Sequence, residues 1–216
     1  MNNKELRLGL TMRIIDAVNY TEPRDALAHD WGVFMKKVLP QAGWIPVPNL
    51  GYDVIDYVKR WQLNGFILTG GNNLFEAKLR DETEFALLEY AIRERLPVLG
   101  VCRGMQFMCH YFGQDIFPCP DTSRHVATNH RINLIDSLMQ WKEELQVNSY
   151  HEYCAGLAKT FKASLLPFAV SEDGLVEGVK SGDEKLLGIM WHPERINPAS
   201  RFDEYLIKNF FDQKGD

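Results

Sequence analysis

The sequence predicts an α/β fold: a doubly wound, mainly parallel central sheet flanked by helices, with added antiparallel strands in the second half. Two observations predict it. In the first half of the chain, short apolar stretches alternate with amphipathic helical stretches, as in β–α–β units. In the second half, strand-like stretches follow one another directly, which is typical of hairpins. The chain has 216 residues with no repeat or linker, so we assign residues 1–216 to one domain.

The first half contains three expected helices. Apolar residues in steps of three and four, including Trp31, Phe34 and Val38, indicate the first helix. Asp81 followed by Glu84 resembles a capping box at the start of the third. In chain order, the expected elements are a strand at 6–12, a helix at 24–39, a strand at 44–48, a helix at 54–61, a strand at 65–69, a helix from 81 to 96 and a strand at 97–101.

The second half is expected to extend the sheet with hairpins and to end in a helix. The expected strands are 123–135, 145–150, 167–171, 175–180 and 186–190, and the closing helix is 199–211.

Composition excludes several classes of protein. The formal net charge of −5 leaves no electrostatic footprint for nucleic acid. No run of 18 apolar residues predicts a membrane span, and the first residues do not resemble a signal peptide, so a cytoplasmic location is expected. Without a secretory signal, the four cysteines (Cys102, Cys109, Cys119 and Cys154) are expected to be free thiols. None of their spacings is CxxC, which argues against structural zinc.

Cys102 is the candidate nucleophile. It follows an apolar strand at 97–101 and precedes a helix-compatible run, as in a nucleophile elbow. Gly100 and Gly104, two residues to either side, leave room for a crowded turn. A helix N-terminus there would favour the thiolate. The alternative is a buried structural cysteine, which is common.

His192 and Glu194 are the candidate base and its orienting group. They follow an apolar strand as His-Pro-Glu, and residues two apart in extended chain project to the same side. Glu194 can then hold one imidazole nitrogen while the other faces a thiol. The alternative is a surface histidine near an unrelated glutamate.

Gly70 and Gly71 end the strand at 65–69. Paired glycines let backbone N–H groups approach a ligand closely. The N–H groups of Gly71 and Arg103 are therefore candidates for an oxyanion hole. The alternative is a tight strand-to-helix turn with no chemical role.

Taken in chain order, these segments resemble the class I glutamine amidotransferase superfamily, and most closely its γ-glutamyl hydrolase branch, the C26-type peptidases. The resemblance covers residues 65–195, with a weaker match before them. The strings that carry it are Thr69-Gly70-Gly71, Leu99-Gly100-Val101-Cys102-Arg103-Gly104-Met105-Gln106, Val147-Asn148-Ser149-Tyr150-His151, Asp173-Gly174-Leu175-Val176-Glu177 and Trp191-His192-Pro193-Glu194.

The resemblance implies roles for these residues in hydrolysis of a γ-glutamyl amide through a thioester. Cys102 corresponds to the nucleophile, His192 to the base, Glu194 to its orienting group, and Gly71 and Arg103 to the oxyanion hole. The residues that correspond to the grip on the glutamyl group are Gly70, Gln106, Ser149 and Tyr150.

The leaving group is the less constrained part. Asn72-Asn73 replaces the Asp-bearing pattern common in the family, and Tyr150-His151-Glu152 differs from the His-rich string of polyamine-pathway relatives. Overall, the chain is similar to members that serve capsular phosphoramidate biosynthesis, which implies a cytidine-diphosphate-bearing leaving group. Nothing in composition or spacing indicates that site. The basic candidates for contact with a diphosphate are Arg13, Arg24, Lys78 and Arg124.

No cofactor is expected, and the expected partner is a small γ-glutamyl substrate. His125, His130 and His151 match no standard metal-site spacing, so no metal is expected. Other functions stay open: a glutaminase subunit that feeds ammonia to a synthase, a hydrolase of another γ-glutamyl amine, and a non-catalytic or redox protein on a related elbow fold. A redox elbow needs neither His192 nor Glu194. Arg103 argues mildly against the glutaminase, so no obligatory synthase partner is expected.

Overall fold

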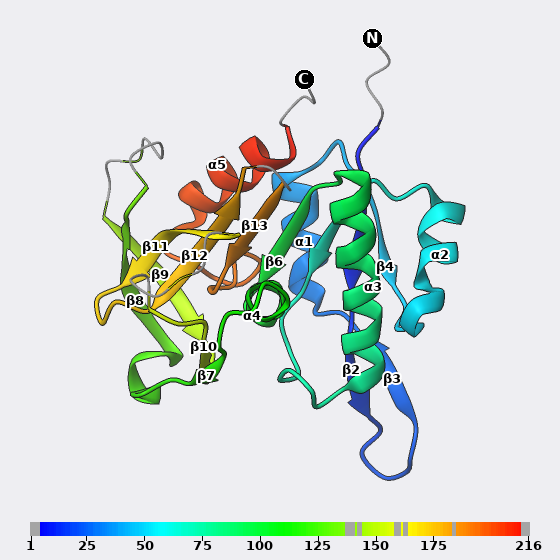
Figure 1. Cartoon of the computed structure of the whole chain (residues 1–216), viewed down its shortest axis with the longest axis horizontal. Coiled ribbons are helices and arrows are strands. Elements are labelled where there is room, and N and C mark those ends of the chain that lie inside the picture. The colour runs from blue at the N-terminus through cyan, green and yellow to red at the C-terminus, as the bar shows by residue number, and fades with distance from the viewer. Residues whose placement is uncertain are drawn as a thin grey trace.

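A computed structural model describes residues 5–136, 141, 144–157, 161, 164–182 and 185–212. Among these residues, one nine-stranded sheet dominates the fold, in the order β4-β1-β5-β6-β13-β12-β11-β8-β9 (Figure 1). Its strands are β1 (Arg7–Thr11), β4 (Gly43–Val47), β5 (Gly65–Leu68), β6 (Val98–Val101), β8 (Val126–Leu134), β9 (Leu145–Tyr150), β11 (Leu166–Ser171), β12 (Val176–Ser181) and β13 (Leu186–Ile189). The helices are α1 (His29–Val38), α2 (Val54–Trp61), α3 (Lys78–Glu94), α4 (Arg103–Tyr111) and α5 (Ser200–Phe211), with short 3-10 turns η1 (Gly51–Asp53) and η2 (Thr122–Arg124).

The strand pairing changes from parallel to antiparallel at β13, which pairs in parallel with β6 and antiparallel with β12. From β4 to β13 all neighbours are parallel. From β12 to β9 every pairing is antiparallel. This confirms the predicted parallel core with an antiparallel extension.

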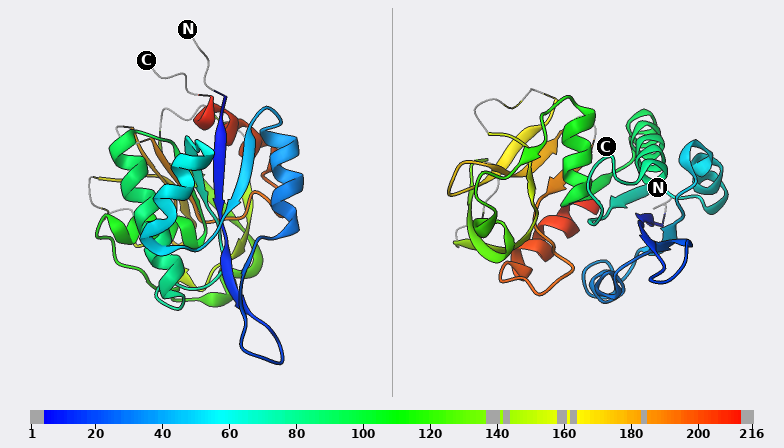
Figure 2. Two further views of the ribbon diagram at one scale, coloured as in Figure 1. Left: turned by 90° about the vertical axis from the view of Figure 1, so that its right-hand side faces the viewer. Right: turned by 90° about the horizontal axis from the view of Figure 1, so that it is seen from below.

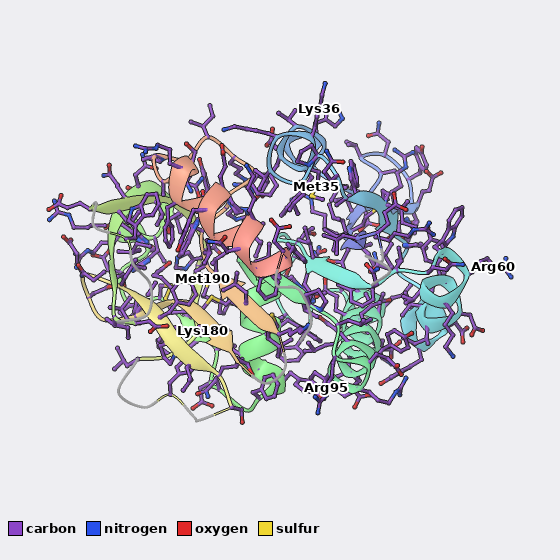
Figure 3. The ribbon with its side chains drawn as sticks, turned by 90° about the horizontal axis from the view of Figure 1, so that it is seen from above. Met35, Lys36, Arg60, Arg95, Lys180 and Met190 are labelled. Carbon is purple, nitrogen blue, oxygen red and sulfur yellow. A yellow bond between two sulfur atoms is a disulfide. The ribbon has the colours of Figure 1, made fainter. Side chains whose placement is uncertain are left out.

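Helices cover both faces of the sheet (Figure 2). Side chains of α1 and α5 pack on one face with Ile67, while those of α2, α3 and α4 pack on the other with Phe66 and Leu68. This alternation follows from the two-residue period of a strand. Figure 3 shows the two sides of α1, where Lys36 points outward, whereas Met35 is fully buried. No helix in the described part of the chain is long and apolar enough to cross a membrane.

The first helix is shorter than predicted, because residues 23–26 form a strand. β3 (Pro23–Ala26) pairs with β2 (Arg13–Asp16) as an antiparallel hairpin, and α1 begins at His29. The hairpin projects beyond the end of β1 (Figure 1). Its two strands have only four residues each and are mostly exposed, with no apolar–polar alternation, so local periodicity did not reveal the hairpin.

The predicted capping box is wrong. Helix α3 begins at Lys78 after Ala77, so Asp81 and Glu84 lie inside the helix. Both carboxylates pair with Arg103, and Glu84 also pairs with Arg80. A long-range ion network therefore explains these acids better than a helix cap.

The expectation of four free thiols is also wrong. Cys119 and Cys154 form a disulfide, while Cys102 and Cys109 are free. Two short strands, β7 (Phe117–Pro118) and β10 (Tyr153–Cys154), pair antiparallel and bring the two Cα atoms to 5.3 Å. This spacing suits a disulfide. The pairing joins segments 35 residues apart, so Cys spacing could not indicate it.

Candidate functional site

Cys102 occupies the sharp turn between β6 and α4, as predicted. Its backbone has φ 52° and ψ −107°, a conformation that a non-glycine residue rarely adopts. A Cβ on Gly104 would lie 2.0 Å from the carbonyl oxygen of Leu68, and one on Gly100 would lie 2.5 Å from Met108 Sδ. Both positions therefore need glycine, which explains the Gly-x-Cys-x-Gly pattern.

His192 lies beside Cys102 because their two strands are neighbours. β6 pairs with β13 in parallel, with Val101 opposite Ile189, and the N–H of Cys102 donates to the carbonyl of Ile189 at 2.8 Å. His192 follows β13, and its Nδ1 lies 2.7 Å from Glu194 Oε1. Both side chains are 3% exposed. The structure thus brings thiol, imidazole and carboxylate together in the predicted order.

The charges of Cys102 and His192 stabilise one another. Burial acts to raise the pKa of Cys102, but His192, the charge of His151 and the N–H of Arg103 together lower it. Burial acts to lower the pKa of His192, but the Cys102 thiolate and Glu194 raise it to about 9. Each charge therefore favours the other, which is the direction that a thiolate–imidazolium pair requires. Cys109 contrasts with Cys102, because burial alone raises its pKa.

Asn148 holds the backbone of His192. Its side-chain oxygen accepts from the N–H of His192 at 2.8 Å, and its amide donates to the carbonyls of His192 at 2.8 Å and Ile196 at 3.1 Å. The resemblance included Asn148 but gave it no role. Its fixed amide explains why an Asn stands in this string.

The loop at Gly70 and Gly71 lies against the candidate triad. A Cβ on Gly70 would lie 2.7 Å from His192 Cε1, and Gly71 has φ +85°. Arg80, fully buried, donates to the carbonyls of Thr69 at 2.6 Å and Gly70 at 3.2 Å, and also to that of Gly71. With these carbonyls held by Arg80, the loop stays beside Cys102.

The side chain of Arg103 is buried below the same loop. It donates to Glu84 and to Asp81. Glu84 also accepts from Arg80 Nε at 2.9 Å. The sequence predicted a role for the backbone N–H of Arg103 but no partner for its side chain, although a charged side chain directly after the nucleophile was a signal for this network.

Cys102 opens into a cavity of about 370 Å³. That volume lies in the range of small-molecule sites. Of the four residues expected to grip the glutamyl group, Gln106 and Tyr150 line it, whereas Gly70 and Ser149 do not. Gln106 Nε2 donates to the carbonyl of Tyr153 at 2.9 Å. Ser149 is fully buried, and its hydroxyl donates to the carbonyl of His125 at 2.6 Å. The lining residues are Arg13, Gly71, Asn72, Asn73, Glu76, Cys102, Arg103, Gln106, Val126, Tyr150, His151, Glu152, His192 and Arg195.

Of the four basic residues suggested for a diphosphate, only Arg13 lines the cavity. The other three form ion pairs: Arg24 with Glu22, Lys78 with Glu82, and Arg124 with Glu172. Arg195 also lines the cavity and lies 4.4 Å above the ring of Tyr150. Sequence reasoning did not single out Arg195, although it directly follows Glu194.

Three histidines gather around Glu177 behind this cavity. His125, His130 and His151 come together with Glu177, and one potential ligand atom of each lies within 4.8 Å of the others. His151 also lines the cavity. Burial acts to raise the pKa of Glu177, but His151 and His130 lower it to about 2. The three histidines therefore form a compact cluster, and it includes Glu177, which the sequence pattern had not placed near them.

A family model described as Peptidase C26 matches residues 34–194. Over 210 residues, the chain is 31% identical to the gamma-glutamyl-CDP-amidate hydrolase of Campylobacter jejuni, and the match covers 94% of this chain and 96% of that protein. It is also 26% identical over 160 residues to a GMP synthase of Clostridium botulinum, of which the match covers 29%.

Solved structures share the fold. A putative GMP synthase subunit from Thermoplasma acidophilum superposes with a TM-score of 0.70 at 16% identity, covering 96% of this chain and 92% of that one. A glutamine amidotransferase from Thermotoga maritima gives a TM-score of 0.61 at 15% identity, covering 94% and 81%. The predicted amidotransferase-like fold is confirmed.

Proposed function

Because the chain belongs to the peptidase C26 family, we propose that it hydrolyses a γ-glutamyl amide with Cys102 as nucleophile, His192 as base and acid, and Glu194 as orienting group. The observation that carries the proposal is the buried thiol–imidazole–carboxylate array at a positive-φ turn. Such an array is the arrangement that nucleophilic acyl transfer requires.

The reaction proceeds in two halves. The Cys102 thiolate attacks the γ-carbonyl carbon, and the oxygen of the tetrahedral intermediate accepts hydrogen bonds from the N–H groups of Gly71 and Arg103. His192 gives its proton to the leaving nitrogen, and the C–N bond breaks to leave a γ-glutamyl thioester. Water then attacks the thioester as His192 takes its proton, and glutamate leaves with the thiolate restored.

For the substrate, we propose γ-glutamyl-CDP-amidate, which would yield cytidine diphosphoramidate for capsule modification. Two facts support this choice: the Campylobacter relative is named for this substrate, and the match between the two proteins covers nearly the whole length of each. The cavity adds two cationic side chains, Arg13 beside Gly71 and Arg195 beside Tyr150. Arginine is well suited to bind phosphate, since its planar fork donates two hydrogen bonds at once.

The test compares kcat/KM for a γ-glutamyl amide, its glutaryl analogue without the α-amine, and γ-glutamyl-CDP-amidate. We expect the glutaryl amide to be rejected, because a site built on hydrogen bonds to the amine would leave its own polar groups unpaired. We expect the nucleotide substrate to be preferred. Equal rates on the first two substrates would contradict glutamyl recognition.

Arg24 offers a matched control for the leaving-group site, since it lies on the same hairpin as Arg13 but pairs with Glu22. Arg13→Met should lower kcat/KM for the nucleotide substrate alone, and Arg24→Met should leave it unchanged. Equal losses on all substrates would remove the CDP-amidate assignment but leave the hydrolase.

The alternative is a glutaminase that passes ammonia to a synthase, and the similarity to GMP synthase favours it. Glutamate release from free glutamine distinguishes the two. A partner-dependent glutaminase should be nearly silent alone, whereas the proposed hydrolase turns over its own γ-glutamyl substrate without another protein.

A further inference from the structure

The cluster of His125, His130, His151 and Glu177 has the composition of a transition-metal site. It offers three imidazole nitrogens and one carboxylate from separate segments of the antiparallel half of the sheet. Their side chains are 1% exposed, except for His130 at 12%. The proposed hydrolysis uses none of these groups as nucleophile or base.

Each histidine is held by its outer nitrogen. Nε2 of His125 lies 3.0 Å from Asp173 Oδ2, Nδ1 of His130 lies 3.1 Å from the carbonyl of Arg124, and Nδ1 of His151 lies 3.1 Å from that of Tyr153. All three partners accept hydrogen bonds, so each outer nitrogen carries a proton. Metal-binding histidines are oriented in this way, by a carboxylate or carbonyl behind the ring.

The inner nitrogens all face Glu177 without a hydrogen bond. Nδ1 of His125, Nε2 of His130, Nε2 of His151 and both oxygens of Glu177 are buried and meet no hydrogen-bond geometry. The nitrogens lie 3.7, 3.5 and 3.4 Å from the carboxylate. In a tetrahedral zinc site with bonds of about 2.0–2.1 Å, neighbouring ligand atoms are about 3.3 Å apart. The spacing thus suits atoms that share a cation better than a direct hydrogen bond.

We propose that His125, His130, His151 and Glu177 bind one Zn²⁺ ion. Three nitrogens and one oxygen suit zinc better than magnesium or calcium, which prefer oxygen ligands. Four protein ligands fill a tetrahedral shell, so the ion is structural and ties β8, β9 and β12 together behind the cavity. His151 joins this site to the wall beside Cys102.

The test measures Zn²⁺ bound by tag-free protein, by calorimetry and by metal analysis after dialysis. Two other pairs of side chains could bind Zn²⁺ and must be prevented from doing so. Cys102 with His192 can also bind zinc, so every protein carries Cys102→Ser. Cys119 and Cys154 stay bonded to each other under non-reducing conditions.

We expect one Zn²⁺ per chain, and Co²⁺ in its place should give the visible absorption of a tetrahedral site. Glu177→Gln and His130→Ala should each weaken binding by more than 100-fold, and Asp173→Asn by roughly 10–100-fold, as for other residues behind a ligand. His110→Ala removes an exposed histidine of α4 and should bind as the parent does.

Near-UV circular dichroism shows whether each variant is folded, and His130→Ala, at the most exposed ligand, serves if Glu177→Gln does not fold. Absence of Zn²⁺ binding in the parent would overturn the proposal. Binding that survives both Glu177→Gln and His130→Ala would also overturn it, because the ion would then lie elsewhere. This result is independent of hydrolase activity, so the two proposals fail separately.

Discussion

Replacing Glu194 by Gln tests whether its charge acts on His192. The two side chains are almost fully buried and their atoms lie 2.7 Å apart. The pKa of His192 is raised to about 9, with Cys102 and Glu194 as the groups that raise it against burial. A raised pKa means that the imidazolium is present below about pH 9 and is lost above it. The alkaline limb of the kcat/KM profile should therefore fall near pH 9.

The amide of Gln still accepts a hydrogen bond but carries no charge. A charged hydrogen bond contributes about 1.5–3 kcal/mol and a neutral one about 0.5–1.5, so the imidazolium loses on the order of 1–1.5 kcal/mol. At 1.36 kcal/mol per pKa unit, this lowers the pKa of His192 by about one unit. The alkaline limb should then move to about pH 8 in Glu194→Gln.

The assay is kcat/KM for a γ-glutamyl amide from pH 5 to 10, on proteins with matched thermal unfolding. His192→Ala should lose roughly 10²- to 10⁴-fold at every pH and show no such limb. Glu89→Gln, an exposed glutamate on α3, is the control and should keep the parent profile. An unmoved limb in Glu194→Gln would refute the electrostatic role of Glu194, and a fully active His192→Ala would refute the triad.

Three further outcomes concern other residues. With limiting iodoacetamide at pH 7, Cys102 should be alkylated far faster than Cys109, because the pKa of Cys102 is lowered and that of Cys109 is raised; peptide mapping that finds equal labelling would contradict this. Cys119→Ser with Cys154→Ser should lower the free energy of unfolding by about 2–4 kcal/mol, because the disulfide closes a 35-residue loop; an unchanged urea midpoint would refute it. Asn148→Ala should lower both stability, by about 2–4 kcal/mol, and kcat, because the buried backbone of His192 loses its partners; normal kcat would show that the clamp does not position the base.

Local signals in the sequence were enough for most elements. The bounds of α2 and β9 match the prediction to the residue, since each carries a clear apolar period. The proximity of Cys102, His192 and Glu194 could also be expected, because each follows an apolar strand and parallel strands end at the same edge of a sheet.

Contacts between distant segments were not readable from local patterns. The Cys119–Cys154 disulfide depends on two strands of two residues each, too short for any periodicity. Glu177 meets its histidines only through the register of β8, β9 and β12. Arg80 holds the glycine loop from the first turn of α3. The predicted capping box started this helix at Asp81, so Arg80 was left outside it.

The pairing of β6 with β13 has a consequence for how this protein can change. The backbone pairing of the two strands fixes the separation of Cys102 from His192. Gly100 lies opposite Gly188, and the N–H of Cys102 donates to the carbonyl of Ile189. Apart from Gly100 and Gly188, where a Cβ would clash, the backbone pairing of these strands sets that separation and their side chains do not. Insertions in the β2–β3 hairpin can therefore reshape the mouth of the cavity without moving the reactive atoms, whereas one residue added between Ile189 and His192 would put them out of step. Exchange of this hairpin can therefore change which leaving group fits the cavity, while the positions of Cys102 and His192 stay the same.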